Sequence, residues 1–245
     1  MLDDATATLE TELAAGADEA TRLHWERYLK GTARFRGVPM AGVRSALRRT
    51  WREHRLAEAS TDELLALAHR WFGAPMSEDK LAAVLLLAEQ MPDRLSVDHL
   101  DALAAPFAAG HVTDWSVCDW YATKALHAFL THDPEDVERR ARGLATWGGA
   151  GSLWQRRAGL VAFVKLAPRA PVQFDGFTDL VVQLCRDNLV SDDRFAHTGP
   201  GWVLRELSRA EPEAVRAFVA AHDRLSDEGR RMALARLRPG PYRRR

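Results

Sequence analysis

The sequence lacks the features that mark several protein classes. It has two cysteines, Cys118 and Cys185, which lie far apart and without CxxC spacing, so neither a zinc site nor a disulfide is expected. It has no apolar run close to the roughly 18 residues that a membrane-spanning helix needs. Its acidic start, residues 1–12, lacks the basic and apolar regions of a signal peptide. We therefore expect a cytoplasmic protein without a membrane segment.

The motifs of common enzyme classes are also missing. There is no GxxxxGK(S/T) phosphate loop, no GxGxxG dinucleotide turn, no HExxH zinc motif and no GxSxG nucleophile elbow. Adjacent acids such as Asp192 and Asp193 are explained by helix capping and the helix dipole, without a metal. The glycine-rich run at 148–151 precedes Ser152 and is interpreted as a loop followed by a helix N-cap. The sequence therefore predicts no metal and no cofactor.

Net charge gives no indication of a polyanionic partner, because 34 lysines and arginines balance 34 aspartates and glutamates. The charges are nevertheless unevenly distributed. Residues 1–20 contain six acids and no base, whereas residues 22–55 contain ten bases and two acids. Residues 139–169 and 230–245 contain seven bases each and no acid. These basic blocks could fold together into a phosphate-binding face, and solvated helix faces explain them equally well.

Helix is the dominant expected structure. Apolar residues recur at helical spacing almost throughout, as at Leu64 and Leu67. Breaks and caps follow at short intervals, including a capping box of Ser60 with Glu63 and a Gly-Pro-Gly break at 199–201. About a dozen helices result, and pairs of roughly 40 residues are typical of HEAT-like helical hairpins. We expect an all-α fold, a curved solenoid of about six antiparallel helix pairs with a concave face.

No change of composition marks a domain boundary, so residues 1–245 are predicted to form a single HEAT-like helical-repeat domain. Residues 1–20 are its acidic N-terminal segment. Residues 239–245 are a basic tail whose order the sequence leaves open.

Aromatic and charged residues gather near the ends of expected helices in four places. These are 28–30 with 35–38, then 113–120, 153–158 and 201–208. In the second, Trp115 and Asp119 are four residues apart and so share one helical face. In this order and at this spacing, the four segments resemble the AlkD-like family of DNA alkylation-repair glycosylases. The resemblance extends over about residues 23–237.

The resemblance implies a HEAT-like solenoid that hydrolyses the N-glycosidic bond of N3- or N7-alkylated purines in duplex DNA, such as 3-methyladenine and 7-methylguanine. It also implies a catalytic carboxylate at Asp119, aromatic contacts to the lesion from Trp115, Trp202 and Tyr28, and a phosphate contact from Arg157. The family is described as acting without inserting the damaged base into a pocket. The sequence does not show which mode applies here.

Two of the segments differ from the family pattern. Ser116 follows Trp115 where the family commonly has an aspartate, and residues 195–201, ahead of Trp202, lack the basic residues of better-known members. These differences indicate a divergent branch of the family.

The chemistry implied by the resemblance agrees with these residue types. Alkylation at N3 or N7 gives the base a positive charge and makes it a competent leaving group. A single carboxylate, here Asp119, can then stabilise the oxocarbenium-like sugar and guide water to C1′. Aromatic faces attract a cationic base or sugar by about 0.5–2 kcal/mol each. In the alternative structural interpretation, Asp119 forms an ion pair with Arg157 or another basic side chain inside the fold, and the tryptophans form core. Core packing is the expectation for Trp51, Trp71, Trp120, Trp147 and Trp154.

The expected partner is duplex DNA containing alkylated bases, bound by a monomer that associates with the nucleoid, with no membrane and no metal. Further DNA contacts are expected from Lys30, Arg34, Arg36, Arg156, Lys165 and Arg205. Two alternatives stay open. One is a catalytically silent member that binds damaged or branched DNA through Arg34, Arg36, Arg156, Arg157 and Lys165. The other is a protein-interaction scaffold, which the neutral net charge favours. Whether bulky adducts are accepted is also open.

Overall fold

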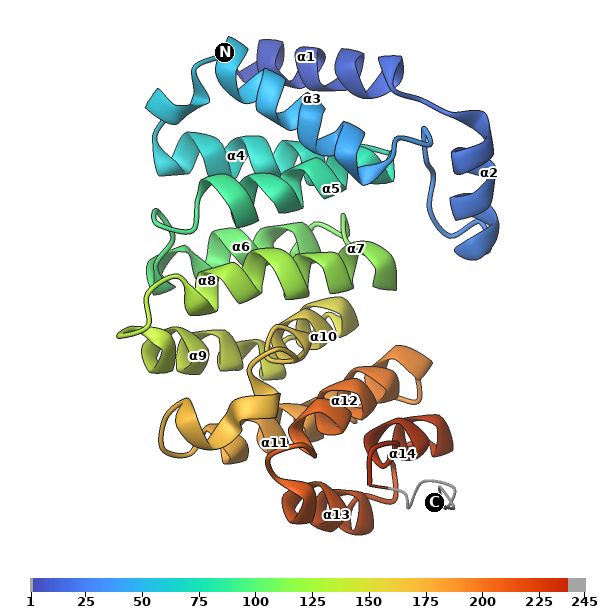
Figure 1. Ribbon diagram of the computed structural model, residues 1–245, viewed down its shortest axis with the longest axis vertical. Coiled ribbons are helices and arrows are strands. Elements are labelled where there is room, and N and C mark those ends of the chain that lie inside the picture. Colours follow the sequence, from blue (N-terminus) through green and yellow to red (C-terminus); the bar gives the residue numbers. More distant parts are fainter. Residues whose placement is uncertain (1, 238–245) are drawn as a thin grey trace, which may run out of the picture. The chain divides into compact units, whose positions relative to one another are not determined.

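The computed structural model describes residues 2–237, which form fourteen α-helices and no strand (Figure 1). The predicted all-α class is therefore confirmed for these residues. The predicted basic tail, residues 239–245, lies outside the described residues. The helices gather into two compact units, residues 1–132 and 133–245, which are described separately below. The single domain and its concave face span both units and stay predictions.

In unit 1, helices that are close in the sequence pack against one another, as α1 does against α3 and α4 against α5. Its helices are α1 (Leu2–Ala15), α2 (Glu19–Tyr28), α3 (Met40–Glu53), α4 (Thr61–Phe72), α5 (Ser77–Leu85), α6 (Leu100–Ala108), α7 (Trp115–Trp120) and α8 (His127–Thr131). Most of the acidic N-terminal segment, residues 1–20, therefore lies in α1. This helix packs into the unit through its buried residues Ala5, Leu9 and Leu13.

Local sequence explains where these helices begin. The predicted capping box of Ser60 and Glu63 is present at the start of α4, where each side chain accepts a bond from the other residue's backbone N–H. Helix α4 then buries Leu64, Leu67 and Trp71, as their spacing predicts.

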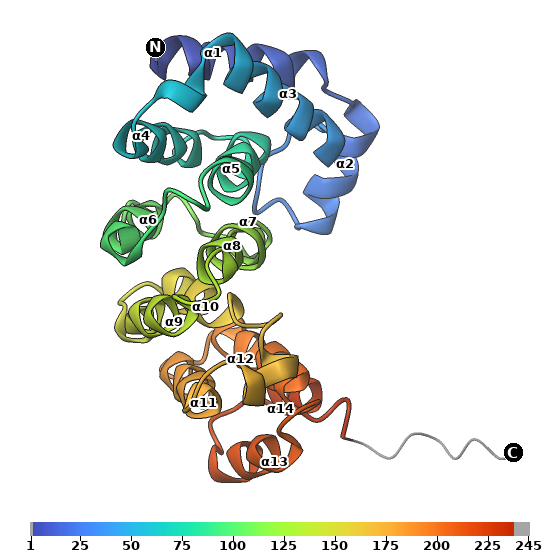
Figure 2. The ribbon, with the colours of Figure 1, turned by 60° about the vertical axis from the view of Figure 1, so that its left-hand side comes forward.

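Helix α2 is unlike its neighbours because none of its residues is buried. Figures 1 and 2 both show it standing off the layers formed by α1 and α3. It nevertheless contains Leu23, Trp25 and Tyr28, which are all exposed large apolar residues. A helix with this composition and no buried face has its aromatic residues available to a partner.

Unit 2 is arranged around α12, which packs against α10, α11 and α14. Its helices are α9 (Val137–Ala145), α10 (Leu153–Val161), α11 (Phe177–Asn188), α12 (Arg194–Leu207), α13 (Pro212–Ala221) and α14 (Asp227–Ala233). The predicted N-cap at Ser152 is confirmed, since its side chain accepts a bond from the Gln155 N–H at the start of α10.

The predicted helix break at 199–201 is wrong, because α12 runs through all three residues. The reason is tertiary packing. A Cβ on Gly201 would come within 2.9 Å of the Gly229 carbonyl oxygen in α14. Glycine here therefore permits the backbones of α12 and α14 to approach closely, and the packing outweighs the poor helix propensity of glycine and proline.

Candidate functional site

Tyr28, at the end of α2, lies against Trp115, the first residue of α7. Tyr28 is 57% exposed, and its ring centroid is 5.8 Å from that of Trp115 at an interplanar angle of 68°. Trp25 packs edge-on to Tyr28 at 5.8 Å and stacks on Phe35 at 6.2 Å. Two of the aromatic residues implied by the resemblance are thus in contact within unit 1, and two more support them.

The start of α7 fixes Trp115. Asp114 is the N-cap, and its carboxylate accepts a bond from the Val117 N–H at 3.0 Å. Burial raises the pKa of Asp114, although bonds from the Val117 and Ser116 N–H groups and the nearby Lys80 act to lower it. Lys80 also donates to the His111 carbonyl at 2.6 Å, which holds the chain just before α7. The direction in which α7 enters the fold is therefore set by buried polar contacts.

Asp119 lies one helical turn after Trp115 and on the same face of α7. It is half-buried, and its carbonyl oxygen accepts a bond from the Thr123 hydroxyl at 2.6 Å. A π-helical segment, Tyr121–Leu126, begins directly after α7. Such segments interrupt a helix locally and are frequent at functional sites. Trp115 and Asp119 therefore lie on one face of α7, as their spacing in the sequence predicts.

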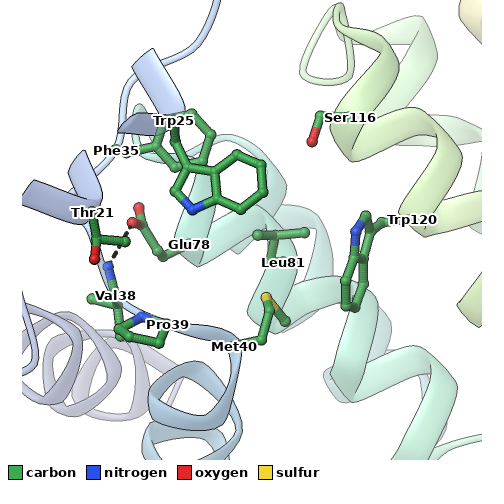
Figure 3. Close-up of a pocket in the computed structure, with 10 residues that line it drawn as sticks. All are labelled: Thr21, Trp25, Phe35, Val38, Pro39, Met40, Glu78, Leu81, Ser116 and Trp120. Atoms are coloured by element: carbon green, nitrogen blue, oxygen red, sulfur yellow. Dashed lines mark hydrogen bonds between the residues drawn. The ribbon is translucent and has the colours of Figure 1, made fainter. Parts of the chain in front are cut away.

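The loop after α2 is held by a buried carboxylate. Glu78, 1% exposed near the start of α5, accepts bonds from three successive backbone N–H groups, those of Arg36, Gly37 and Val38, at 2.8–3.1 Å. Figure 3 shows one of these bonds, to Val38. Because this loop also contains Phe35, on which Trp25 stacks, Glu78 indirectly supports the aromatic cluster.

Gly37 is required by this arrangement. Its φ is +90°, which other residues rarely adopt, and a Cβ would collide with the carbonyl oxygen of Asp18. Arg36 forms an ion pair with Asp79, which is 1% exposed. Burial raises the pKa of Asp79, and the bond from Arg36 acts against that rise. Arg36, a predicted DNA contact, thus has a structural partner in unit 1.

The basic residues around Tyr28 differ in their pairing. Lys30 and Arg34 are exposed, as is Arg27, and none of these three forms an ion pair within residues 2–237. Most other arginines of the first basic block are paired. Examples are Arg22 with Glu19 and Glu26, Arg44 with Glu89, Arg49 with Glu12, and Arg55 with Glu58. Three of the uncompensated positive charges of this block therefore lie close to Tyr28 in the sequence, and two more, Arg48 and Arg52, are exposed on α3.

The two arginines of α10 that the sequence predicts as DNA contacts, Arg156 and Arg157, are buried in unit 2. Arg156 and Arg157 are 7% and 4% exposed. Arg156 donates to the carbonyls of Ala150 and Gly151, at 2.6 and 3.0 Å, and so closes the loop before α10. Arg157 donates to the carbonyl of Phe195 at 3.1 Å and to the hydroxyl of Thr198 at 3.2 Å. Arg157 therefore links α10 to α12, the helix that contains Trp202.

The remaining candidates in unit 2 are dispersed. Trp202 is half-buried on α12, and Lys165 is exposed. Arg205 pairs with Glu206 at 2.9 Å, and Glu206 also binds Arg236. Burial alone would raise the pKa of Glu206, but the bonds from Arg236 and Arg205 prevail and lower it. Arg205 thus belongs to a local ion-pair network.

Sequence reasoning did not identify Glu78, Asp79 or Asp114 as supports of the site. Asp114 could have been found, since an aspartate directly before an apolar helical pattern is an N-cap signal. The contacts of Glu78 join residues 40 or more positions apart, and no local pattern predicts them. Core packing is confirmed for Trp71 and Trp147, whereas Trp51, Trp120 and Trp154 are only half-buried.

No helix among residues 2–237 is long and apolar enough to cross a membrane. The same residues contain no group of three or more histidine, cysteine, aspartate or glutamate side chains placed to hold a metal ion.

Comparison with known proteins agrees with the resemblance inferred from the four segments. A model of the DNA alkylation repair enzyme family matches residues 9–237. No curated protein matches the sequence. Among solved structures, the fold is similar to that of a predicted DNA alkylation repair enzyme from Enterococcus faecalis, with a TM-score of 0.72 and 17% sequence identity over 89% of this chain and 95% of that chain. At this identity the likeness shows the fold alone. Because the family model covers most of the sequence, the chain belongs to the DNA alkylation repair enzyme family.

Proposed function

We propose that the protein is a DNA glycosylase that hydrolyses the N-glycosidic bond of cationic N3- or N7-alkylated purines in duplex DNA and leaves an abasic site. The observation that most directly supports this is the geometry of α7. It presents Trp115 and Asp119 on one face, with the exposed ring of Tyr28 against Trp115 at 5.8 Å. Aromatic faces beside a carboxylate suit a reaction in which positive charge develops on the sugar.

The leaving base needs little acid catalysis in this reaction. Because an alkylated purine is already positively charged, protonation of the leaving group is not required. Asp119 would stabilise the oxocarbenium-like sugar and orient the attacking water, while Trp115 and Tyr28 would attract the cationic nucleotide.

Contacts to the DNA backbone would hold the substrate in register. Lys30 and Arg34 are exposed and unpaired within the described residues, so they can neutralise phosphates without losing an internal ion pair. From unit 2 we propose Arg157 as a phosphate contact and Trp202 as a further aromatic contact. The bonds of Arg157 to α12 would orient its guanidinium before DNA binds. Such contacts position the duplex and do not read its sequence.

The experiment that tests this function is release of free base from methylated duplex DNA. We expect wild-type protein to release 7-methylguanine or 3-methyladenine and to leave an equal number of abasic sites. We expect Trp115→Ala to react about tenfold more slowly, because the loss of one cation–π contact in a desolvated site costs about 1–2 kcal/mol. Wild-type protein that binds DNA with a steep salt dependence and releases neither base would contradict the proposal and favour a silent DNA-binding member.

A further inference from the structure

The helix that begins at Trp115 continues well beyond α7. Helix α7 is followed directly by the π-helical segment Tyr121–Leu126 and then by α8, and the three run in line (Figure 1). Along residues 115–131, two accessible side chains alternate with two buried ones. The accessible side chains of these residues, named here the α7–α8 stripe, begin with Trp115 and Ser116 and recur every four residues, at Asp119 and Trp120 and then at Thr123 and Lys124.

The π-helical segment explains why this stripe stays on one face. In an α-helix of about 3.6 residues per turn, a residue four positions on is rotated about 40° too far, and this drift accumulates along the helix. A π-helical turn closes its hydrogen bond one residue later, so it contains more residues and rotates less at each of them. The segment at 121–126 therefore offsets the drift, and Thr123 and Lys124 stay on the accessible side that Asp119 occupies.

Lys124 lies about one turn beyond the proposed catalytic carboxylate. At a rise of about 1.5 Å per residue, residues 119 and 124 are roughly 7 Å apart along the helix axis. Successive nucleotides of one DNA strand are about 3.4 Å apart along the duplex axis. Lys124 is therefore within about two nucleotide steps of a sugar held at Asp119.

The ammonium group of Lys124 has no carboxylate partner among residues 2–237. The structure places its Nζ over the indole of Trp120, 5.4 Å from the ring centroid. A cation at this distance is attracted by the aromatic face, but the contact leaves its charge uncompensated by an anion. The N–H donors of a lysine ammonium are therefore available to a phosphate at this point of the stripe.

Trp120 restricts where this ammonium can lie. Its indole lines a cavity of about 300 Å³ bounded by α2, α3, α5 and α7, and Figure 3 shows it facing Leu81 and Met40. Because Lys124 is four residues after Trp120, its stem runs along the same side of the helix as the indole. Such a restricted side chain loses less conformational entropy when it binds an anion.

We propose that Lys124 binds a backbone phosphate of duplex DNA, within about two nucleotides of the lesion, and so holds the lesion in register with Asp119. The proposal rests on the proposed function, since it takes DNA as the substrate. Lys124 is a positioning residue in this account, because it contacts the backbone and not the reacting atoms. The contact requires no base outside the duplex, and it holds the DNA without reading its sequence.

Lys124→Met tests the contact, because methionine keeps an unbranched apolar stem over Trp120 and removes the charge. Its affinity for a duplex with an abasic-site analogue should fall on the order of tenfold, as expected for the loss of one charged hydrogen bond. The slope of log K against log salt should become shallower by about 0.9. Lys124→Arg keeps the charge and should keep the wild-type slope. Arg55→Met is the matched control, because Arg55 is exposed and already paired with Glu58.

Neutral methylphosphonate linkages identify the phosphate. They replace single phosphates on each strand, up to two positions on either side of the abasic-site analogue. We expect one replacement that weakens binding to wild type on the order of tenfold and has no further effect on Lys124→Met. Arg55→Met should respond to that replacement as wild type does.

Folding and catalysis provide the remaining readouts. The thermal midpoint of Lys124→Met should stay close to that of wild type. On methylated DNA, the variant should raise KM and leave the saturated rate of base release within a few-fold of wild type, as expected when binding is lost equally from the ground and transition states.

Two results would overturn the proposal. One is that every methylphosphonate weakens wild type and Lys124→Met equally. The other is that Lys124→Met lowers the saturated rate while its DNA affinity and salt slope stay those of wild type, which would assign the lysine to the reaction itself.

These outcomes are separable from those for the proposed function, because the binding measurements need no base release. Protein that shows a phosphate contact dependent on Lys124 and releases no base would refute the glycosylase and keep the contact. Protein that releases base without any such phosphate contact would do the reverse.

Discussion

The basic residues beside Tyr28 in unit 1 and Arg156 of α10 in unit 2 come from similar basic blocks of the sequence, and they differ in burial and in partners. Lys30 and Arg34 are exposed and pair with no carboxylate among the described residues. Arg156 is buried and binds the backbone carbonyls of Ala150 and Gly151. A basic block in the sequence therefore does not identify a phosphate-binding surface. Burial and internal partners decide which arginines are available to DNA and which hold the protein together.

The largest effect on stability is expected at Glu78, which holds the loop of residues 36–38 in unit 1. Glu78→Ala leaves three backbone N–H groups in the 36–38 loop without their acceptor, which should lower the free energy of unfolding by about 3 kcal/mol or more. Glu78→Gln keeps one carbonyl acceptor and should cost clearly less. Urea unfolding measures both, with exposed Glu135→Ala as the control. Equal stabilities for Glu78→Ala and Glu135→Ala would remove the anchoring role given to Glu78.

The next largest effect on stability is expected at Arg156 in unit 2. Arg156→Ala removes two bonds to the carbonyls of Ala150 and Gly151, and should lower the free energy of unfolding by about 1–3 kcal/mol. Arg34→Ala should change stability by less than about 0.5 kcal/mol, because the side chain is exposed. Thermal and urea unfolding of the two variants test this directly. If Arg34→Ala were the more destabilising, the division into structural and available arginines would be wrong.

Changes at the exposed basic residues beside Tyr28, which should affect stability little, should weaken DNA binding. The Lys30→Ala/Arg34→Ala double variant should bind duplex DNA more weakly, and the slope of log K against log salt should become shallower by about 2, at roughly 0.9 per phosphate contact. Arg55→Ala is the matched control from the same basic block, because Arg55 is exposed and already paired with Glu58 at 2.5 Å. Similar slope changes in both would show that the pairing does not select the DNA contacts.

The smallest effect concerns the N-cap of α7. Burial raises the pKa of Asp114 above its ordinary value of 3.8, so the folded state holds the proton more tightly than the unfolded state. The ionised group therefore costs stability above pH 3.8, and this cost disappears as the pH falls through the folded pKa. Relative to Asp114→Asn, wild type should gain stability between pH 7 and pH 4. A constant difference in the free energy of unfolding across that range would exclude this titration.

Much of the fold could be predicted from the sequence because helical periodicity and capping are local signals. The capping box at Ser60 and the N-cap at Ser152 were both predicted from neighbouring residues alone. The break predicted at 199–201 failed because the contact with Gly229 that keeps this part of α12 helical is distant in sequence. Local propensity cannot report a close approach between two helices.

The candidate site was predictable only in part. The shared face of Trp115 and Asp119 follows from their spacing, whereas the contact of Trp115 with Tyr28 depends on how α2 is held. That support comes from Glu78, whose bonds to the 36–38 loop have no sequence signature. Trp120 was predicted to be core and instead lines a cavity, because an apolar residue at helical spacing can face either.

The most direct test of the central claim is the single-turnover rate of base release by Asp119→Asn on methylated duplex DNA. The control is Asp101→Asn, an exposed aspartate on α6 in the same unit. The account predicts that Asp119→Asn folds and binds DNA like wild type and releases base about 10² times more slowly or worse, the scale for losing a preorganised electrostatic group, while Asp101→Asn keeps the wild-type rate. An Asp119→Asn rate within a few-fold of wild type would contradict the catalytic role of this carboxylate.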